Sequence, residues 1–201
     1  MKPQYRTWSR ALEFAVAIAA LITSVTSIWL SLRQGDDMAR LVQAQSWPYL
    51  EYLSSNTGNA GPAIDIGVRN AGVGPAKVKS FSVVYDGTAV PGWVALIRAC
   101  CVPDGKKIET TQDLLTLTDD KMISSKLIDR VLRPTDEVIL LHLPKTEANA
   151  LLWKKLDQAR FKLDIHACYC SVFDECWITD LRSTTAKSVA SCPVDPTPYI
   201  E

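Results

Sequence analysis

The sequence predicts a mainly β protein in which one N-terminal transmembrane helix precedes an antiparallel β-sandwich with one or two inserted helices. Three observations lead to this fold class. An uncharged apolar run fills residues 14–32, short strand-like runs follow residue 48, and all six cysteines lie after residue 99. A chain of 201 residues has room for one span and one domain of ordinary size. The predicted segments are an N-terminal flank (1–13), the transmembrane helix (14–32), a stalk helix (33–47), the sandwich domain (48–192) and a C-terminal tail (193–201).

The apolar run from Phe14 to Leu32 contains 19 residues and no charge. At about 1.5 Å per residue, a helix of this length crosses roughly 28 Å, close to the hydrocarbon thickness of a bilayer. Trp8 and Trp29 lie near its two ends, where aromatic rings favour the headgroup level. A cleaved signal peptide would have a shorter run and a small-residue cleavage site. The run therefore predicts an uncleaved membrane anchor.

Small side chains recur every four residues within this run and share one face of the helix. They are Ala15, Ala19, Thr23, Ser27 and Ser31. Such a face lets two helices approach closely, which suggests self-association or docking on another membrane protein. Small residues are also common in spanning helices that do not associate, so both interpretations stay open.

Basic residues on the two sides of the run predict its orientation. Lys2, Arg6 and Arg10 precede it, together with the amino terminus, whereas Arg33 and Arg40 follow it. The excess on the first side favours an N-terminus in the cytoplasm and a globular domain outside, in the periplasm of a cell that has one.

The remainder of the chain has the pattern of an antiparallel sandwich, in which short apolar runs alternate with turn residues such as Asp86-Gly87. The expected strands are 49–53, 63–68, 76–85, 137–143, 160–170 and 176–183. The expected helices are 93–101 and 147–159, the second with Thr146 as N-cap. Residues 104–129 allow no detailed assignment, and the proline-containing tail after Cys192 is expected to be extended or loose.

Two turn motifs carry a resemblance to a known family. The first is N-A-G-V-G-P-A-K-V at residues 70–78, and the second is L-R-P-T-D-E at residues 132–137. They resemble the N-x-G-x-G-P-A and L-x-P-G-E turns of bacterial Ig-like sandwich domains, with Thr135 where that pattern has glycine. The layout, with Trp-Pro-Tyr-Leu at 47–50, is also similar to a broad group of single-pass bacterial membrane proteins. The resemblance implies an Ig-like sandwich at the bacterial inner membrane. Many such proteins carry more arginine after the span, which implies a cytoplasmic domain as the alternative orientation.

Four cysteines lie in or near one predicted hairpin, formed by 160–170 and 176–183. Alternation places one set of side chains outward and the other toward the core. The outward set is Asp164, His166, Cys168 and Cys170, and the core set is Leu163, Ile165, Ala167 and Tyr169. If Cys170 faces Cys176, His166 faces Asp180 and Asp164 faces Arg182, two complementary pairs that a slipped register would lose. This register predicts a Cys170–Cys176 disulfide across the loop from Ser171 to Glu175.

A second bridge is expected between Cys192 and either Cys100 or Cys101. Such cysteine usage fits an oxidising compartment and supports the outside orientation. The alternative for the hairpin is a metal site, because His166, Cys168, Cys170 and Cys176 offer nitrogen and sulfur ligands suited to zinc or copper(I). Ligands on alternate strand positions lie nearly 7 Å apart, so a disulfide is the expected role and no cofactor is predicted.

No catalytic constellation stands out in the sequence. His142 lies in an apolar run and is expected to be a satisfied core residue. The run 72–75 is a turn and not a phosphate loop, because Pro75 lacks a donor N–H. The Cys100-Cys101 pair lacks C-x-x-C spacing. A net charge of zero without a basic block gives nucleic-acid binding no electrostatic basis.

The sequence therefore predicts a membrane-anchored, non-enzymatic binding or accessory protein that docks on a protein partner in the cell envelope, without a small-molecule substrate. The rival from another class is a metal-binding or thiol-redox envelope protein that uses the cysteine hairpin.

Overall fold

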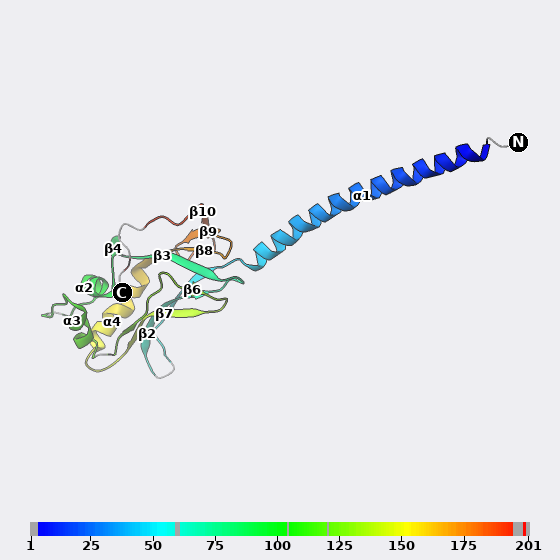
Figure 1. Ribbon diagram of the computed structural model, residues 1–201. Helices are drawn as coiled ribbons and strands as arrows, with labels where there is room; N and C mark the ends of the chain where they lie inside the picture. The colour runs from blue at the N-terminus through cyan, green and yellow to red at the C-terminus, as the bar shows by residue number, and fades with distance from the viewer. Residues whose placement is uncertain (1–3, 59–60, 104, 120, 195–198, 200–201) are drawn as a thin grey trace. The chain divides into compact units, whose positions relative to one another are not determined.

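The computed structural model describes residues 4–58, 61–103, 105–119, 121–194 and 199, with side chains from residue 12 onward. The chain divides into two compact units, one ending at Gln45 and the other beginning at Ser46. Figure 1 shows the helix of the first unit and the mixed helices and strands of the second. Each unit is described by itself below.

The first unit is a single helix, α1 (Gln4–Gln45), of 42 residues and therefore about 63 Å long. The predicted span and the predicted stalk belong to this one helix, and Gly35 does not interrupt it. Its part from Leu12 to Gln45 is long and apolar enough to cross a membrane, with a mean hydropathy of 2.0 over its most apolar window. A signal sequence near the N-terminus can meet the same criteria of length and hydropathy, so this agreement concerns those two properties only.

The small-residue face of α1 is exposed along its length. The hydroxyl of Thr23 donates to the carbonyl of Ala20 at 2.9 Å, which satisfies it within the helix. At the far end of the apolar run, the guanidinium of Arg33 lies 4.5 Å from the ring of Trp29. Association through the small-residue face stays a prediction. Lys2 lies outside the described residues, and the side chains of Arg6 and Arg10 do as well, so the orientation also stays a prediction.

The second unit contains two antiparallel sheets. The order of strands in the first sheet is β1-β2-β7-β5, and in the second it is β10-β9-β8-β3-β4, with β6 also paired to β3. The strands of the first sheet are β1 (Leu50–Ser55), β2 (Ala63–Asn70), β5 (Ile123–Ser124) and β7 (Glu137–Pro144). Those of the second are β3 (Ala76–Tyr85), β4 (Thr88–Val90), β6 (Val131–Leu132), β8 (Leu163–Cys170), β9 (Cys176–Thr179) and β10 (Lys187–Val189).

Helices contribute more than the sequence predicted. The domain contains α2 (Trp93–Cys100), α3 (Thr111–Leu117), α4 (Ala150–Ala159) and a 3-10 turn (Arg160–Lys162). About 34% of the chain is helical and 31% is strand, so helix and strand contribute about equally to the whole chain, in which α1 alone has 42 residues. The predicted antiparallel sheets are confirmed.

Helix α3 lies in the region that allowed no assignment from sequence. A capping box starts it: Thr110 Oγ1 accepts from the backbone N–H of Asp113, and the Asp113 carboxylate accepts from the N–H of Thr110. Helix α4 starts later than predicted because Asn149, and not Thr146, is its N-cap. Thr146 and Asn149 exchange hydrogen bonds between side chain and backbone just before it.

The core is formed by the apolar side chains of both sheets together with α2 and α4. Strand β3 does not alternate strictly, because its pairing with β8 shifts register between Val78 and Ser80. The shift lets Val78 and Phe81, three residues apart, both point into the core. The largest fully buried side chains include Tyr169, Phe81, Leu50, Ile64 and Ile66.

One described residue of the C-terminal tail, Tyr199, is buried. Tyr199 is 5% exposed, and its ring lies 5.4 Å, centroid to centroid, from both Phe81 and Trp93 in edge-on geometry. Residues 195–198, 200 and 201 lie outside the described residues. The tail thus contributes one aromatic side chain to the core.

Candidate functional site

The buried side chain of Asn70 holds together three segments at one end of the domain. Its Oδ1 accepts from the N–H of Tyr49 at 3.2 Å and of Gly72 at 3.0 Å. Its Nδ2 donates to the carbonyls of Gly74 at 2.8 Å and Leu132 at 3.0 Å. All four hydrogen-bonding positions of the amide are used, so the first residue of the N-x-G-x-G-P-A motif has a structural role.

The two glycines of that motif let the segment 46–49, which follows α1, lie directly against the β2–β3 turn. A Cβ on Gly74 would collide with the backbone of Ser46, and a Cβ on Gly72 would collide with the backbone of residues 47–49. The N–H groups of Val73 and Gly74 both donate to the carbonyl of Trp47 at 3.0 Å. The motif therefore fixes the start of the domain to its β2–β3 turn.

Thr135, which replaces the usual glycine of the second motif, has a φ of 69°. This is the left-handed region, which glycine adopts most easily and β-branched residues rarely adopt. The N–H of Thr135 donates to the carbonyl of Asn70 at 2.9 Å. Both turn motifs thus meet at Asn70.

The β8–β9 hairpin has the predicted register, with Cys170 opposite Cys176 and Tyr169 opposite Trp177. The sulfurs of Cys170 and Cys176 are bonded at 2.06 Å, with their Cα atoms 4.0 Å apart. The predicted core face of β8 is also observed, because Leu163, Ile165, Ala167 and Tyr169 are buried. Burial raises the pKa of the Tyr169 hydroxyl to about 12, so this side chain stays neutral.

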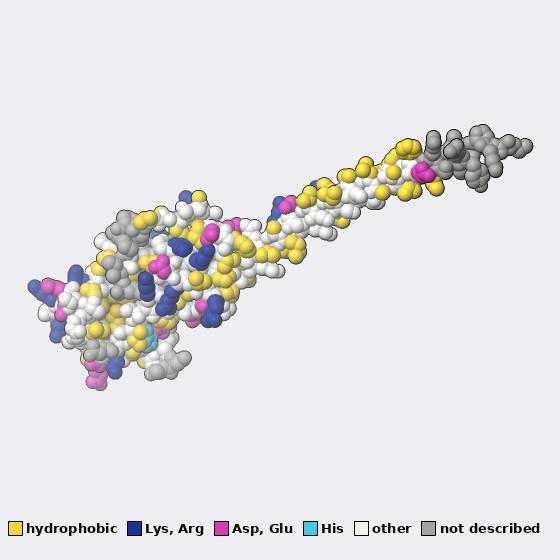
Figure 2. Space-filling model, viewed as in Figure 1, with side chains coloured by type: hydrophobic (Ala, Val, Ile, Leu, Met, Phe, Trp, Pro, Cys, Tyr) yellow, Lys and Arg dark blue, Asp and Glu magenta, His cyan; other side chains and the backbone are white. Residues whose placement is uncertain are grey.

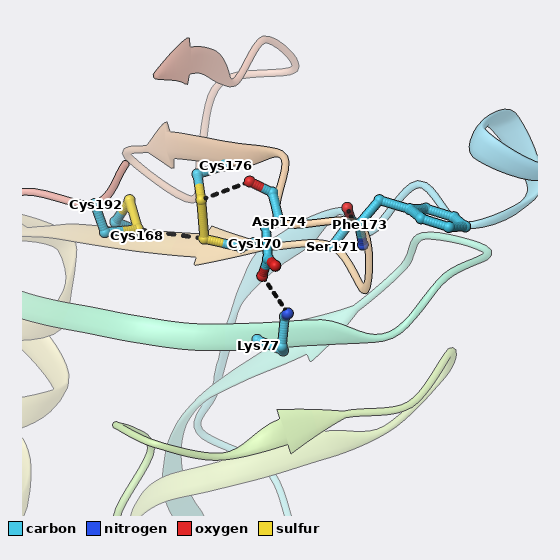
Figure 3. The surroundings of a disulfide bond; sticks show 8 residues. All are labelled: Lys77, Cys168, Cys170, Ser171, Phe173, Asp174, Cys176 and Cys192. Carbon is cyan, nitrogen blue, oxygen red and sulfur yellow. Dashed lines mark hydrogen bonds and ion pairs between the residues drawn. A yellow bond between two sulfur atoms is a disulfide. The ribbon is translucent and has the colours of Figure 1, made fainter. Parts of the chain in front are cut away.

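The predicted bridge from Cys100 or Cys101 to Cys192 is wrong. Cys192 is bonded to Cys168 instead, because the segment after β10 brings it beside β8. Cys100 and Cys101, at the end of α2, are bonded to each other. Figure 3 shows the two hairpin bridges side by side, and the sulfurs of Cys170 and Cys192 are 3.8 Å apart.

The loop from Ser171 to Glu175 is closed by its own hydrogen bonds. The N–H of Ser171 donates to the carbonyl of Glu175 at 2.8 Å, and that of Phe173 donates to Ser171 Oγ at 3.1 Å. Asp174 reaches across to β3, where its carboxylate pairs with Lys77 Nζ at 2.5 Å (Figure 3). The hydrogen bond from Lys77 lowers the pKa of Asp174. The loop is thus fixed at its base by a disulfide and at its side by an ion pair.

The predicted charge pairs of the hairpin do not form as a ladder. Strand β9 ends at Thr179, and Leu181 has a φ of 58°, so the chain turns away before Arg182 can face Asp164. Arg182 instead lies 5.4 Å from the ring of Tyr52, and Asp164 faces Val84 on β3. Asp180 keeps an electrostatic interaction with His166, but its hydrogen bonds serve the turn.

Asp180 gives the turn a pH-dependent contribution to stability. Its Oδ1 accepts from Ser183 N–H and Ser183 Oγ, both at 2.7 Å, and from Arg182 N–H at 3.0 Å. The Ser183 N–H is the largest cause that lowers the pKa of Asp180, to about 2. A carboxylate with a lowered pKa stabilises the folded chain above about pH 4, and this contribution is lost as the pH falls toward 2.

We therefore expect the Asp180→Asn variant to be less stable than the natural chain at pH 5 and to lose less stability between pH 5 and pH 2. Urea denaturation at a series of pH values measures this difference. Parallel curves for the two chains over this range would contradict the role given to the turn.

His142 is not the core residue that the sequence suggested. Its side chain is 35% exposed on the outer face of the first sheet, and Nδ1 lies 2.5 Å from Oδ1 of Asp65 on the neighbouring strand. Both side chains occupy one row of the sheet, with Ser55 on the next strand opposite Asp65. Ser55 Oγ donates to the carbonyl of Thr57, so the row forms no relay from hydroxyl to imidazole.

A surface cavity of about 470 Å³ is lined by basic side chains, including Arg98, Lys106 and Lys107. The guanidinium of Arg98 already donates to the carbonyls of Ile108 at 2.8 Å and Glu109 at 3.1 Å. In the described structure, Arg98 therefore holds the segment after α2 in place.

Large apolar side chains are exposed at the end of the domain that Asn70 organises, and this region is called the loop end below. Its members are Trp47, Val73, Val131, Val172 and Phe173, which are 45% to 61% exposed. Trp47 and Val73 are joined by a hydrogen bond between backbone groups. Lys77 lies opposite Val131 in the β3–β6 pair and is paired with Asp174 of the β8–β9 loop. Figure 2 shows hydrophobic side chains gathered at this end of the domain.

Comparison with the models of known protein families, with curated proteins and with solved structures finds no match. The function must therefore be inferred from the residues of this chain.

Proposed function

We propose that the chain is a membrane-anchored, non-enzymatic binding protein whose loop end docks on a membrane protein partner. The observation that carries the proposal is the exposure of five large apolar side chains, four on connecting segments and Val131 on strand β6, in a region tied by backbone hydrogen bonds, a disulfide and an ion pair. Solvent-exposed apolar clusters of this kind mark interaction sites more often than isolated surface residues do. Rigid loops lose little conformational freedom on binding, which favours affinity.

The position of the loop end along the chain supports a protein partner over lipid. Thirteen residues of α1 separate Leu32, the end of the apolar run, from Gln45. They extend up to about 20 Å at a helical rise of about 1.5 Å per residue, farther than the headgroup layer. The segment 46–49 then belongs to the loop end itself.

The domain itself is proposed to be Ig-like. Its strand order supports this assignment, because β1-β2-β7-β5 and β9-β8-β3-β4 follow the order ABED and GFCC′ of Ig sandwiches. In that correspondence the loop end includes the connections β2–β3 and β8–β9, and these are the B–C and F–G loops with which variable-type Ig domains bind. The helices α2 and α3 are insertions between β4 and β5.

The proposed location is the bacterial inner membrane, with the domain in the periplasm. The three cysteine pairs support this side, because disulfides persist in oxidising compartments. A domain in the cytoplasm is the alternative, and it would keep the same docking surface.

The docking surface can be tested with a photo-crosslinking amino acid in place of Phe173. Phe161 supplies a matched control, since it is also an exposed phenylalanine (67% against 53%) but precedes β8, whereas Phe173 follows it. Across the eight residues of β8 the two positions lie roughly 25 Å apart. In cells, we expect a discrete crosslinked product from position 173 and none from position 161.

The same product should disappear when Val73 or Trp47 is replaced by serine, because these side chains share the surface with Phe173. Equal crosslinking from positions 161 and 173, or a product that survives both substitutions, would contradict docking through the loop end.

A further inference from the structure

We propose that three cysteines of the β8–β9 hairpin, together with Cys192 after β10, form a redox-switched metal site. When oxidised it holds the bridges Cys168–Cys192 and Cys170–Cys176, and when reduced it binds one zinc ion through four thiolates. The Cys170–Cys176 bridge also closes the loop that carries Phe173, but metal binding by the reduced chain is measured apart from docking, so either proposal can fail without the other.

The distances between sulfurs fit a tetrahedral ion. The sulfurs of Cys170, Cys176 and Cys192 all lie within 4.8 Å of one another, and the contact between Cys170 and Cys192 is 3.8 Å. Zinc–sulfur bonds of about 2.3 Å at tetrahedral angles place neighbouring sulfurs about 3.8 Å apart. The sulfur of Cys168 lies outside this group of three but is bonded to that of Cys192, and it would supply the fourth ligand once that bridge opens. When the bridges are reduced, the two sulfurs of each bridge can move apart to about 3.8 Å, the distance that already separates Cys170 from Cys192.

The backbone keeps the four residues together after the bridges open. Antiparallel pairing fixes Cys168, Cys170 and Cys176 on adjacent strands β8 and β9. Cys192 follows β10, which pairs with β9. Binding therefore requires side-chain rotation and little rearrangement of strands, which reduces the cost of forming the site.

The surroundings suit thiolates and offer access. Cys168, Cys170 and Cys176 are at most 5% exposed, so a bound ion would be shielded from water. Lys77 lies opposite Cys170 on β3, and its ammonium is paired with the carboxylate of Asp174. A surface cavity of about 210 Å³ that includes Cys168 and Pro193 in its lining reaches the Cys168–Cys192 bridge from outside. Four soft sulfur ligands select zinc or copper(I) over magnesium or calcium.

His166, which the sequence offered as a ligand, is replaced by Cys192 in this site. His166 is exposed, whereas Cys168 is buried and bonded to Cys192, a member of the described group of ligand atoms within 4.8 Å. Cys192 could not be assigned to this site from the sequence, because fifteen residues, which include strand β10, lie between it and Cys176.

A dithiol reductant supplies the electrons and protons that open the two bridges. Each bridge takes two electrons and two protons from one dithiol, which becomes a disulfide, and four thiols result. Zinc binding then releases up to four protons as the thiolates coordinate the ion.

Cobalt(II) is the probe for the test, because tetrahedral cobalt–thiolate sites absorb visible and near-ultraviolet light. The full chain in mild detergent is reduced without oxygen, freed of reductant and titrated with cobalt, then with zinc. We expect one cobalt per chain, the spectrum of four-sulfur coordination and displacement by zinc. The oxidised chain should bind none.

Variants locate the site. Cys192→Ser and Cys176→Ser should each lose the four-sulfur spectrum, whereas the double variant Cys100→Ser with Cys101→Ser should keep it. Tryptophan fluorescence of each reduced variant reports whether it is folded. His166→Ala should bind as the natural chain does.

The proposal is overturned if the reduced natural chain binds no cobalt, whether folded or unfolded. It is also overturned if the spectrum survives in Cys192→Ser, or if it is lost in the Cys100 and Cys101 double variant while that variant remains folded.

Discussion

Replacing Asn70 by alanine should lower the free energy of unfolding by about 3 to 5 kcal/mol, because each buried polar group left without a partner costs roughly 1–3 kcal/mol. The substitution removes four hydrogen bonds at once, to Tyr49, Gly72, Gly74 and Leu132. A loss of this size is a large part of the stability of an ordinary domain. Denaturation of the full chain in detergent, followed by tryptophan fluorescence, measures it.

Asn149 provides a matched control for this prediction. It is also buried, at 1% exposure, but its side-chain amide makes only two of the described hydrogen bonds, to Thr146 N–H and the Pro144 carbonyl. Asn149→Ala should therefore cost clearly less than Asn70→Ala. Equal losses for the two variants would mean that Asn70 is an ordinary buried amide and does not organise the loop end.

Removal of the hairpin bridges should have the second large effect. The Cys168–Cys192 bridge closes a separation of 24 residues and the Cys170–Cys176 bridge one of 6. On the chain-entropy model these loops correspond to about 3.5 and about 2.3 kcal/mol of stability. We expect the paired alanine variant of the first bridge to be less stable than that of the second, in urea denaturation of the oxidised chain.

A reductant is the control for the bridge variants. In its presence, with a chelator to remove metal, both variants should approach the stability of the reduced natural chain. If the order of the two variants were reversed in the oxidised state, the pairing of Cys192 with Cys168 would be contradicted.

The elements that local patterns determine could be predicted from the sequence. Strand β3 has the predicted bounds 76–85, and the predicted register of Cys170 with Cys176 is observed, although the charge pairs used to predict it do not form. The turn motifs were visible as glycine and proline patterns. The role of these motifs could not be predicted, because the hydrogen-bonding partners of Asn70 lie up to 62 residues away in the sequence.

The errors have physical causes that sequence patterns do not show. The pairing of Cys192 depends on β10, a three-residue strand too short to stand out. His142 lies in an apolar run, but a neighbouring strand supplies Asp65 on the outer face of the sheet. The loop end, the main candidate site, joins residues from four separate segments, and single exposed apolar residues are too common to predict such a surface.

Alkaline carbonate extraction of cell membranes, combined with mass measurement of the retained chain, tests most directly whether α1 anchors the domain. We predict that the chain stays with the membrane pellet and that its mass includes the apolar run Phe14 to Leu32. A chain released by carbonate, or one that begins after Leu32, would contradict the anchored docking protein.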